Sequence, residues 1–190
     1  PTDIEEIRVA SPTMGIIGTG RYARGIAQAV CAVRPIRKIK VYSRNPENVR
    51  KFCDSMREAL GIEVSAAPSG REAVRNTDIM ITATSGNTIV FESSWLEPGV
   101  LFMSLAPGEF DEDTALQSRV FLSGSDQVLG DNPPRKPFDT LVASGRFKPE
   151  DVAAEFCDVV AGKKPGRRSE EEIILYESPG MGLLDAGIGH

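Results

Sequence analysis

The chain has 190 residues, with 22 Lys or Arg against 27 Asp or Glu, so its formal net charge at pH 7 is −5. This balance disfavours non-specific nucleic-acid binding and adhesion to an anionic membrane, because both rely on excess positive charge. Apolar residues make up 41%, an ordinary value for a globular domain, and no apolar run approaches the roughly 20 residues that span a bilayer.

The cysteines and the single histidine exclude several kinds of site. Cys31, Cys53 and Cys157 have no CxxC spacing, and an odd count suits no disulfide framework. His190 is the only histidine, so neither a His-based catalytic triad nor a multi-His metal site is expected. The first residues have neither the basic leader nor the apolar core of an export signal. We therefore expect idle or buried thiols, no metal, and a cytoplasmic location.

Strands and helices alternate along most of the chain after a leading segment, residues 1–12. The elements predicted in order are a strand at 13–17, a helix at 21–33, a strand at 38–43, a helix at 47–60, a strand at 62–66, a short helix at 73–76, and strands at 78–84, 100–105 and 120–123. Asn45 and Pro46 are suited to the start of the second helix, and Gly61 to its end. Ser69 and Glu72 have the spacing of a capping box before the short helix.

A proline-rich loop at 131–137 is a plausible domain edge. Beyond it we predict an amphipathic helix at 150–161, a turn at 166–169 and a strand at 173–176. The alternating order predicts an α/β fold with a doubly wound parallel sheet. We expect this domain to span residues 13–150. Residues 151–190 would form a C-terminal helix and a return segment toward a substrate or dimerisation domain outside this chain.

A glycine-rich turn joins the first predicted strand to the first predicted helix. It reads Gly18-Thr19-Gly20-Arg21-Tyr22-Ala23, the pattern G-x-G-x-x-A. In this context the first glycine permits a tight turn, the second lets a pyrophosphate approach the backbone, and the alanine lets the helix pack close to the sheet. The amides at the helix start then face the anion. The motif predicts a Rossmann-type dinucleotide-binding domain rather than a purely structural turn.

The tip of the second predicted strand bears on the choice of cofactor. A site selective for NAD usually carries Asp or Glu about 20 residues past the glycine motif. Here the tip reads Tyr42-Ser43-Arg44-Asn45 and holds no carboxylate. Arg44 is suited to stacking on adenine and pairing with a 2′-phosphate, while Ser43 and Asn45 add hydrogen bonds. The tip favours NADP(H) over NAD(H), with a solvated surface arginine as the alternative.

Four parts of the chain resemble the ornithine cyclodeaminase/mu-crystallin family. They are Met14–Arg24, Val41–Asn45, Ala73–Ile79 with Thr82–Ser85, and Gly162–Glu172. The resemblance implies a nicotinamide-dependent enzyme acting at the α-carbon of an amino or imino acid, in a homodimer. It also implies cofactor-binding roles by position. The residues concerned are Gly18, Gly20, Arg21 and Ala23 at the pyrophosphate, Ser43, Arg44 and Asn45 at the adenosine end, Thr82, Ala83, Thr84 and Ser85 along the groove, and Leu105 and Ala106 near the nicotinamide. Thr19 and Tyr22 of the same turn are also expected at the cofactor, with packing as the alternative for Tyr22.

Two departures from the family pattern limit what the resemblance implies. Family members carry a substantial N-terminal region that supplies substrate-binding Arg and Lys, whereas only about a dozen residues precede the motif here. No catalytic residue is therefore assigned. Cyclodeaminases also place an Asp after the fifth strand, where this chain reads Ser104-Leu-Ala-Pro-Gly-Glu-Phe110. That stretch and Ser178–Asp185 are more similar to the branch that oxidises N-(2-amino-2-carboxyethyl)glutamate. An ammonia-eliminating cyclodeaminase and a non-catalytic, crystallin-like binding protein are the alternatives.

Several other residues invite a functional interpretation but favour a plainer one. Glu109 follows the fifth strand, where ligands bind in such sheets, yet we expect a solvated loop acid. Asp185 is expected to be a cap or turn residue, and Trp95 a packing anchor. We interpret the basic residues around Gly166 as a solvated turn rather than an anion site; they are Lys163, Lys164, Arg167 and Arg168.

Overall fold

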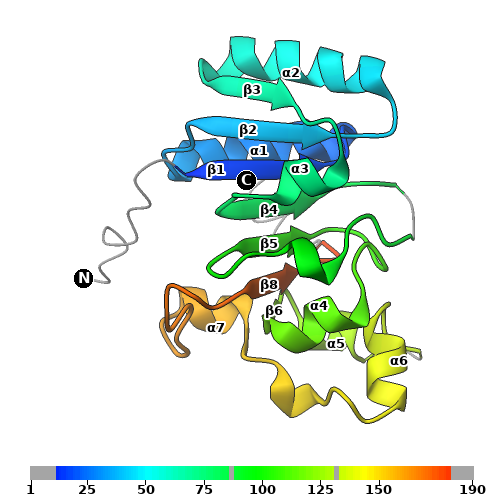
Figure 1. Ribbon diagram of the computed structural model, residues 1–190. Helices are drawn as coiled ribbons and strands as arrows, with labels where there is room; N and C mark the ends of the chain where they lie inside the picture. Colours follow the sequence, from blue (N-terminus) through cyan, green and yellow to red (C-terminus); the bar gives the residue numbers. More distant parts are fainter. Residues whose placement is uncertain (1–11, 86–87, 131–132, 181–190) are drawn as a thin grey trace.

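An eight-stranded parallel sheet forms the centre of the molecule (Figure 1). The structure, a computed structural model, describes residues 12–85, 88–130 and 133–180. The strand order is β3-β2-β1-β4-β5-β8-β6-β7. The strands are β1 (Thr13–Ile17), β2 (Lys38–Tyr42), β3 (Glu63–Ala66), β4 (Ile79–Thr82), β5 (Leu101–Ser104), β6 (Arg119–Leu122), β7 (Ala154–Glu155) and β8 (Ile174–Glu177). The predicted doubly wound parallel sheet is confirmed.

Helices cover both faces of this sheet. They are α1 (Arg21–Val33), α2 (Pro46–Leu60), α3 (Gly70–Val74), α4 (Glu112–Gln117), α5 (Ser125–Val128), α6 (Phe138–Ala143) and α7 (Phe156–Val160), with short 3-10 turns η2 (Ser93–Trp95) and η3 (Pro149–Asp151). Figure 1 shows α1 behind the sheet and α3 in front of it. Within the described residues, no helix is long and apolar enough to cross a membrane.

Successive side chains on each strand point to opposite faces, so two hydrophobic cores form. Met14 and Ile16 of β1 pack with α1 and α2, whereas Ile17 packs with α3 on the other face. That second core continues under α4, α5 and α6 and contains a series of tilted or edge-to-face phenylalanine pairs. The rings in it are Phe91, Phe102, Phe110, Phe138 and Phe147. This core fixes the loops that follow β4 and β5, which carry part of the site described below.

Local signals placed the start and end of the second helix correctly. Asn45 Oδ1 accepts hydrogen bonds from the backbone N–H groups of Glu47 and Asn48, at 3.0 and 3.2 Å. Gly61 ends α2 in the left-handed conformation, with φ of +66°. The short third helix, in contrast, begins earlier than expected, because Ser69 caps Glu72 and α3 starts directly at Gly70.

Only the last part of the predicted helix at 150–161 is α-helical. The segment divides into η3, the edge strand β7 and the short helix α7. The backbone N–H of Ala153 donates to Val120 O at 2.9 Å, and buried Ala154 pairs with Phe121 of β6. Pairing with an available sheet edge therefore outweighs the helical spacing of the apolar residues.

The segment beyond residue 150 contributes to the sheet. β8 lies between β5 and β6, so residues on both sides of the expected boundary build one layer. The expected path toward a further domain stays a prediction. The helices α4, α5 and α6 were not predicted from the sequence, because their four to six residues are too few for a periodic pattern. Asp185 and residues 1–11 lie outside the described residues.

Candidate functional site

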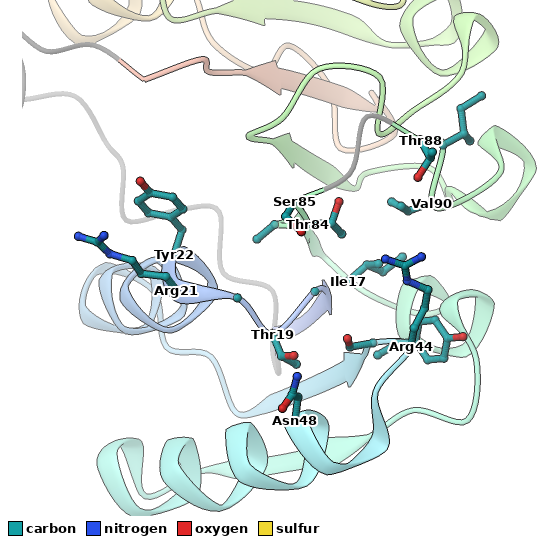
Figure 2. Close-up of a pocket in the computed structure, with 16 residues that line it drawn as sticks. Ile17, Thr19, Arg21, Tyr22, Arg44, Asn48, Thr84, Ser85, Thr88 and Val90 are labelled. Atoms are coloured by element: carbon teal, nitrogen blue, oxygen red, sulfur yellow. The ribbon is translucent and has the colours of Figure 1, made fainter.

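A hollow of about 680 Å³ lies at the carboxyl ends of β1, β2 and β4 (Figure 2). Strand order reverses beside β1, and parallel sheets of this kind bind ligands at such a position. Figure 2 shows Arg21 and Tyr22 at one end of the hollow and Arg44 at the other. Of the described residues that line it, two are arginines and none carries a carboxylate. The hollow is therefore suited to an anionic ligand.

The turn after β1 is held closely between the neighbouring strands. Gly18 N–H donates to Tyr42 O at 2.8 Å, and Gly18 has a φ of +109°. A Cβ at Gly18 would lie 2.3 Å from the carbonyl oxygen of Ala83. Both the conformation and the lack of space therefore require glycine at this position.

Gly20 is glycine for a different reason. Its φ of −71° is ordinary, and a Cβ there would lie 3.6 Å from Ala83 O, a normal contact. The fold does not need a glycine at residue 20, yet this residue lines the hollow. The absence of a side chain leaves the backbone open to a ligand, as a close-approaching phosphate requires.

The N-terminus of α1 adds positive potential to the same place. Gly20 is the N-cap residue, and among the described residues no side chain caps the helix. Its first turn, Arg21–Arg24, contains no acidic residue. The amide groups of a helix start lack partners within the helix and lie at the positive end of its dipole. A phosphate group is the ligand that such an arrangement favours.

Most of the predicted cofactor residues line the hollow. They are Gly18, Thr19, Gly20, Arg21, Tyr22, Ser43, Arg44, Ala83, Thr84 and Ser85. The structure places the other five elsewhere. Ala23 and Thr82 are buried in the protein interior, and Leu105 and Ala106 follow β5 outside the lining. Asn45 also lies outside the lining, and its side-chain oxygen caps α2.

Sequence reasoning missed six lining residues. They are Ile17, Tyr42, Asn48, Thr88, Ile89 and Val90. Ile17 and Tyr42 end β1 and β2, so the motif at the carboxyl end of β1 could have indicated them. Asn48 lies in the first turn of α2, where a helical position gave no functional signal. Val90 belongs to a loop without periodic pattern, and its backbone N–H donates to Glu109 O at 2.9 Å.

The expectation of a solvated Glu109 is wrong. Its side chain is 0% exposed. Glu109 Oε1 accepts from Thr84 N at 2.8 Å and from Thr84 Oγ1 at 2.5 Å, and Oε2 accepts from Ala106 N at 3.2 Å. Burial of a carboxylate is costly unless donors satisfy it, and here three N–H or O–H groups do so. Two of the three donors belong to Thr84, which is 25 residues away, so local sequence patterns could not indicate them.

Glu109 lies near a buried polar row at the end of the sheet. Thr82, Ser104 and Glu177 are register partners on β4, β5 and β8, and each is 0% exposed. Burial raises the pKa of Glu177, Arg135 lowers it through Nε, 3.4 Å from Glu177 Oε1, and the charge of Glu109 raises it; the resulting pKa is about 8. The folded state thus favours the protonated form of Glu177 more than the unfolded chain does.

The two motif glycines should respond differently to the same substitution. We expect Gly18→Ala to destabilise the fold by about 2–3 kcal/mol, through strain and the clash with Ala83 O. Gly20→Ala should cost about 1 kcal/mol or less, but the added methyl should weaken dinucleotide binding by at least about tenfold. Urea unfolding and titration of NADH fluorescence measure the two effects. Unchanged NADH affinity in folded Gly20→Ala would contradict the site.

Glu177 predicts a pH dependence of stability. Its pKa is raised from the ordinary 4.5 to about 8 in the folded state. Between these values the unfolded chain has released a proton that the folded chain retains, so the free energy of unfolding falls as pH rises. Glu177→Gln should remove this contribution, which is at most about 1.4 kcal/mol per pH unit. Urea unfolding of both proteins from about pH 5 to about pH 8 tests it; equal slopes would contradict the prediction.

Comparison with known proteins agrees with this geometry. The sequence profile of the ornithine cyclodeaminase/mu-crystallin family matches residues 8–188. A Delta(1)-pyrroline-2-carboxylate reductase from Bacillus cereus is 32% identical over 178 residues, which are 91% of this chain and 54% of the relative. The chain thus spans about half the length of the curated relatives it matches.

Two solved structures share the fold over nearly the whole chain. Delta(1)-pyrroline-2-carboxylate reductase from Thermococcus litoralis, in complex with NADH and L-proline, is 34% identical with a TM-score of 0.85, over 94% of this chain and 56% of that one. An archaeal alanine dehydrogenase dimer with bound NAD is 28% identical with a TM-score of 0.82, over 96% and 56%. With its G-x-G-x-x-A turn and its parallel sheet, this chain belongs to the ornithine cyclodeaminase/mu-crystallin family.

Proposed function

We propose that this chain is the dinucleotide-binding part of an NAD(P)-dependent oxidoreductase that acts at the α-carbon of an amino or imino acid. The observation that carries this proposal is the hollow at the start of α1. It combines an uncapped helix N-terminus with a glycine, Gly20, that the fold itself does not require. Two similar proteins, a Delta(1)-pyrroline-2-carboxylate reductase and an alanine dehydrogenase, have names that specify substrates of this class.

The lining residues fit a dinucleotide. The backbone from Gly18 to Gly20 and the first amides of α1 would hold the pyrophosphate. Ser43, Arg44 and, from α2, Asn48 would hold the adenosine end, while Thr84 and Ser85 would border the nicotinamide end. When bound, the nicotinamide supplies or accepts the hydride, and the protein contributes position and electrostatics.

The substrate-binding side of the site belongs to the full-length protein in this proposal. A cation for the substrate carboxylate and a group for the amine proton would come from the part of the relatives that this chain does not span. We also propose that the full-length protein is a homodimer, because the similar archaeal alanine dehydrogenase is a dimer. A cyclic imino acid is the first substrate to test, because two similar proteins are named Delta(1)-pyrroline-2-carboxylate reductase.

The loop after β5 disfavours the cyclodeaminase alternative. A carboxylate in this loop would have to face the reacting amino acid. Here Glu109 instead turns inward to Thr84 and Ala106 and is 0% exposed. An oxidoreductase that returns its cofactor to solution in changed form needs no carboxylate at that position.

The full-length protein should oxidise NADH or NADPH in the presence of Delta(1)-pyrroline-2-carboxylate or another imino acid. Loss of NAD(P)H absorbance measures this turnover, and Gly20→Ala serves as the variant with an impaired cofactor site. Release of ammonia from ornithine without net cofactor change would instead indicate a cyclodeaminase. Cofactor binding with no turnover of any imino or amino acid would indicate a non-catalytic binding protein.

Within this function we propose that Arg44 favours NADP(H) over NAD(H). Arg44 is exposed at the tip of β2 and lines the hollow, and no lining carboxylate of the described residues would repel a 2′-phosphate. A charge-assisted contact is worth roughly 1.5–3 kcal/mol, which corresponds to about a ten- to hundredfold preference. The two similar structures with a bound cofactor hold NADH and NAD, so both cofactors must be compared directly.

Arg44→Ala should weaken NADPH binding by about ten- to hundredfold and leave NADH binding nearly unchanged. Arg21→Ala, at the opposite end of the hollow, is the matched control and should weaken both cofactors equally. Dissociation constants from cofactor fluorescence provide the measurement. Equal native affinities for the two cofactors, or an equal loss for both in Arg44→Ala, would show that Arg44 does not recognise the 2′-phosphate.

A further inference from the structure

Glu109 connects three segments that come together at the carboxyl edge of the sheet. Its carboxylate accepts from the backbone and hydroxyl of Thr84 after β4, and from the backbone of Ala106 after β5. Its own carbonyl oxygen accepts from Val90 N–H at 2.9 Å. Thr84 and Val90 both line the hollow, whereas Glu109 does not. One buried residue thus fixes two separate points on the wall of the hollow.

The contact with Thr84 sets the orientation of that side chain. Thr84 Oγ1 donates to Glu109, and its methyl group points toward the turn after β1, 3.2 Å from where a Cβ on Gly18 would lie. A threonine has few favourable rotamers, and a charged acceptor selects one of them strongly. The side-chain orientation of Thr84, which lines the hollow beside the glycine turn, is therefore set by Glu109.

We propose that Glu109 is a positioning residue for the cofactor: it holds Thr84 in the orientation that a dinucleotide requires, without touching the dinucleotide itself. This proposal rests on the function proposed above. Three donors converge on a carboxylate that is 0% exposed, and two of them belong to one lining residue. A carboxylate serving the interior alone would not need to engage both polar groups of a residue that faces the hollow.

Glu109→Gln in the full-length protein tests the proposal. The amide keeps the shape but offers one acceptor instead of two and loses the charge, so Thr84 should no longer be held in one orientation. We expect the dissociation constant of the preferred reduced cofactor, measured by fluorescence, to rise about tenfold. The cofactor KM should rise with it, while kcat changes little. Glu92→Gln, which removes the same charge from an exposed acid, is the control and should bind like the native protein.

Variants of Thr84 show whether Glu109 acts through this residue. Thr84→Ser keeps the hydroxyl and should bind cofactor more tightly than Thr84→Val, which keeps the shape but cannot donate to Glu109. In the double variant Thr84→Val with Glu109→Gln, the dissociation constant should lie within about twofold of that of Glu109→Gln alone, because both changes remove the same interaction. Additive losses would overturn the proposal.

The arms of the experiment separate the possible failures. If the native protein binds neither NADH nor NADPH, the proposed function is wrong, and the role of Glu109 with it. If the native protein binds and folded Glu109→Gln binds equally well, only the positioning role is overturned, even where its urea stability is reduced. Should Glu109→Gln fail to fold, Thr84→Val decides alone: an unchanged dissociation constant overturns the proposal, and about a tenfold rise supports it.

Discussion

The close approach of the turn after β1 to its two neighbouring strands underlies the whole site. Gly18 donates to the end of β2 and leaves no room for a side chain against Ala83, which follows β4. The turn is therefore fixed between two strands that contribute their own lining residues. Because α1 begins directly after it, the same contact aims the helix N-terminus into the hollow. The geometry for an anion follows from backbone packing rather than from any one charged side chain.

The second constraint is electrostatic and lies deeper in the sheet. Glu109 and Glu177 are both 0% exposed, and each is compensated differently. Three donors reach the carboxylate of Glu109, whereas the carboxyl oxygens of Glu177 have no hydrogen-bond partner among the described residues, and burial beside Arg135 leaves its pKa raised to about 8. This polar group links the ends of β4, β5 and β8 beside a largely apolar core. Through this group, the loops that follow β4 and β5 beside the hollow are connected to β8 in the other half of the sheet.

The sequence predicted the parallel sheet and the glycine turn because their signals are local. The apolar strand before Gly18 and the cap at Asn45 act within a few residues of their own position. The errors arose where distant segments meet. The helix expected at 150–161 gives way to a strand because β6 offers an open edge, and Glu109 is buried because Thr84 and Ala106 supply donors. The edge of β6 and Thr84 are distant in the sequence from the residues they pair with, and Ala106, only three residues before Glu109, meets its carboxylate through the folding of the loop. The lining role of Val90 likewise depends on a backbone contact to another loop.

In the proposed function, the start of α1 holds the pyrophosphate of a dinucleotide. Amide chemical shifts recorded by NMR during a titration with NADH or NADPH test it most directly, because each backbone N–H reports its own surroundings. We expect the amides of Gly20, Arg21 and Tyr22 to shift most strongly, and ADP-ribose, which retains the pyrophosphate, to shift the same three. Binding that leaves these amides unchanged and shifts residues elsewhere would contradict it.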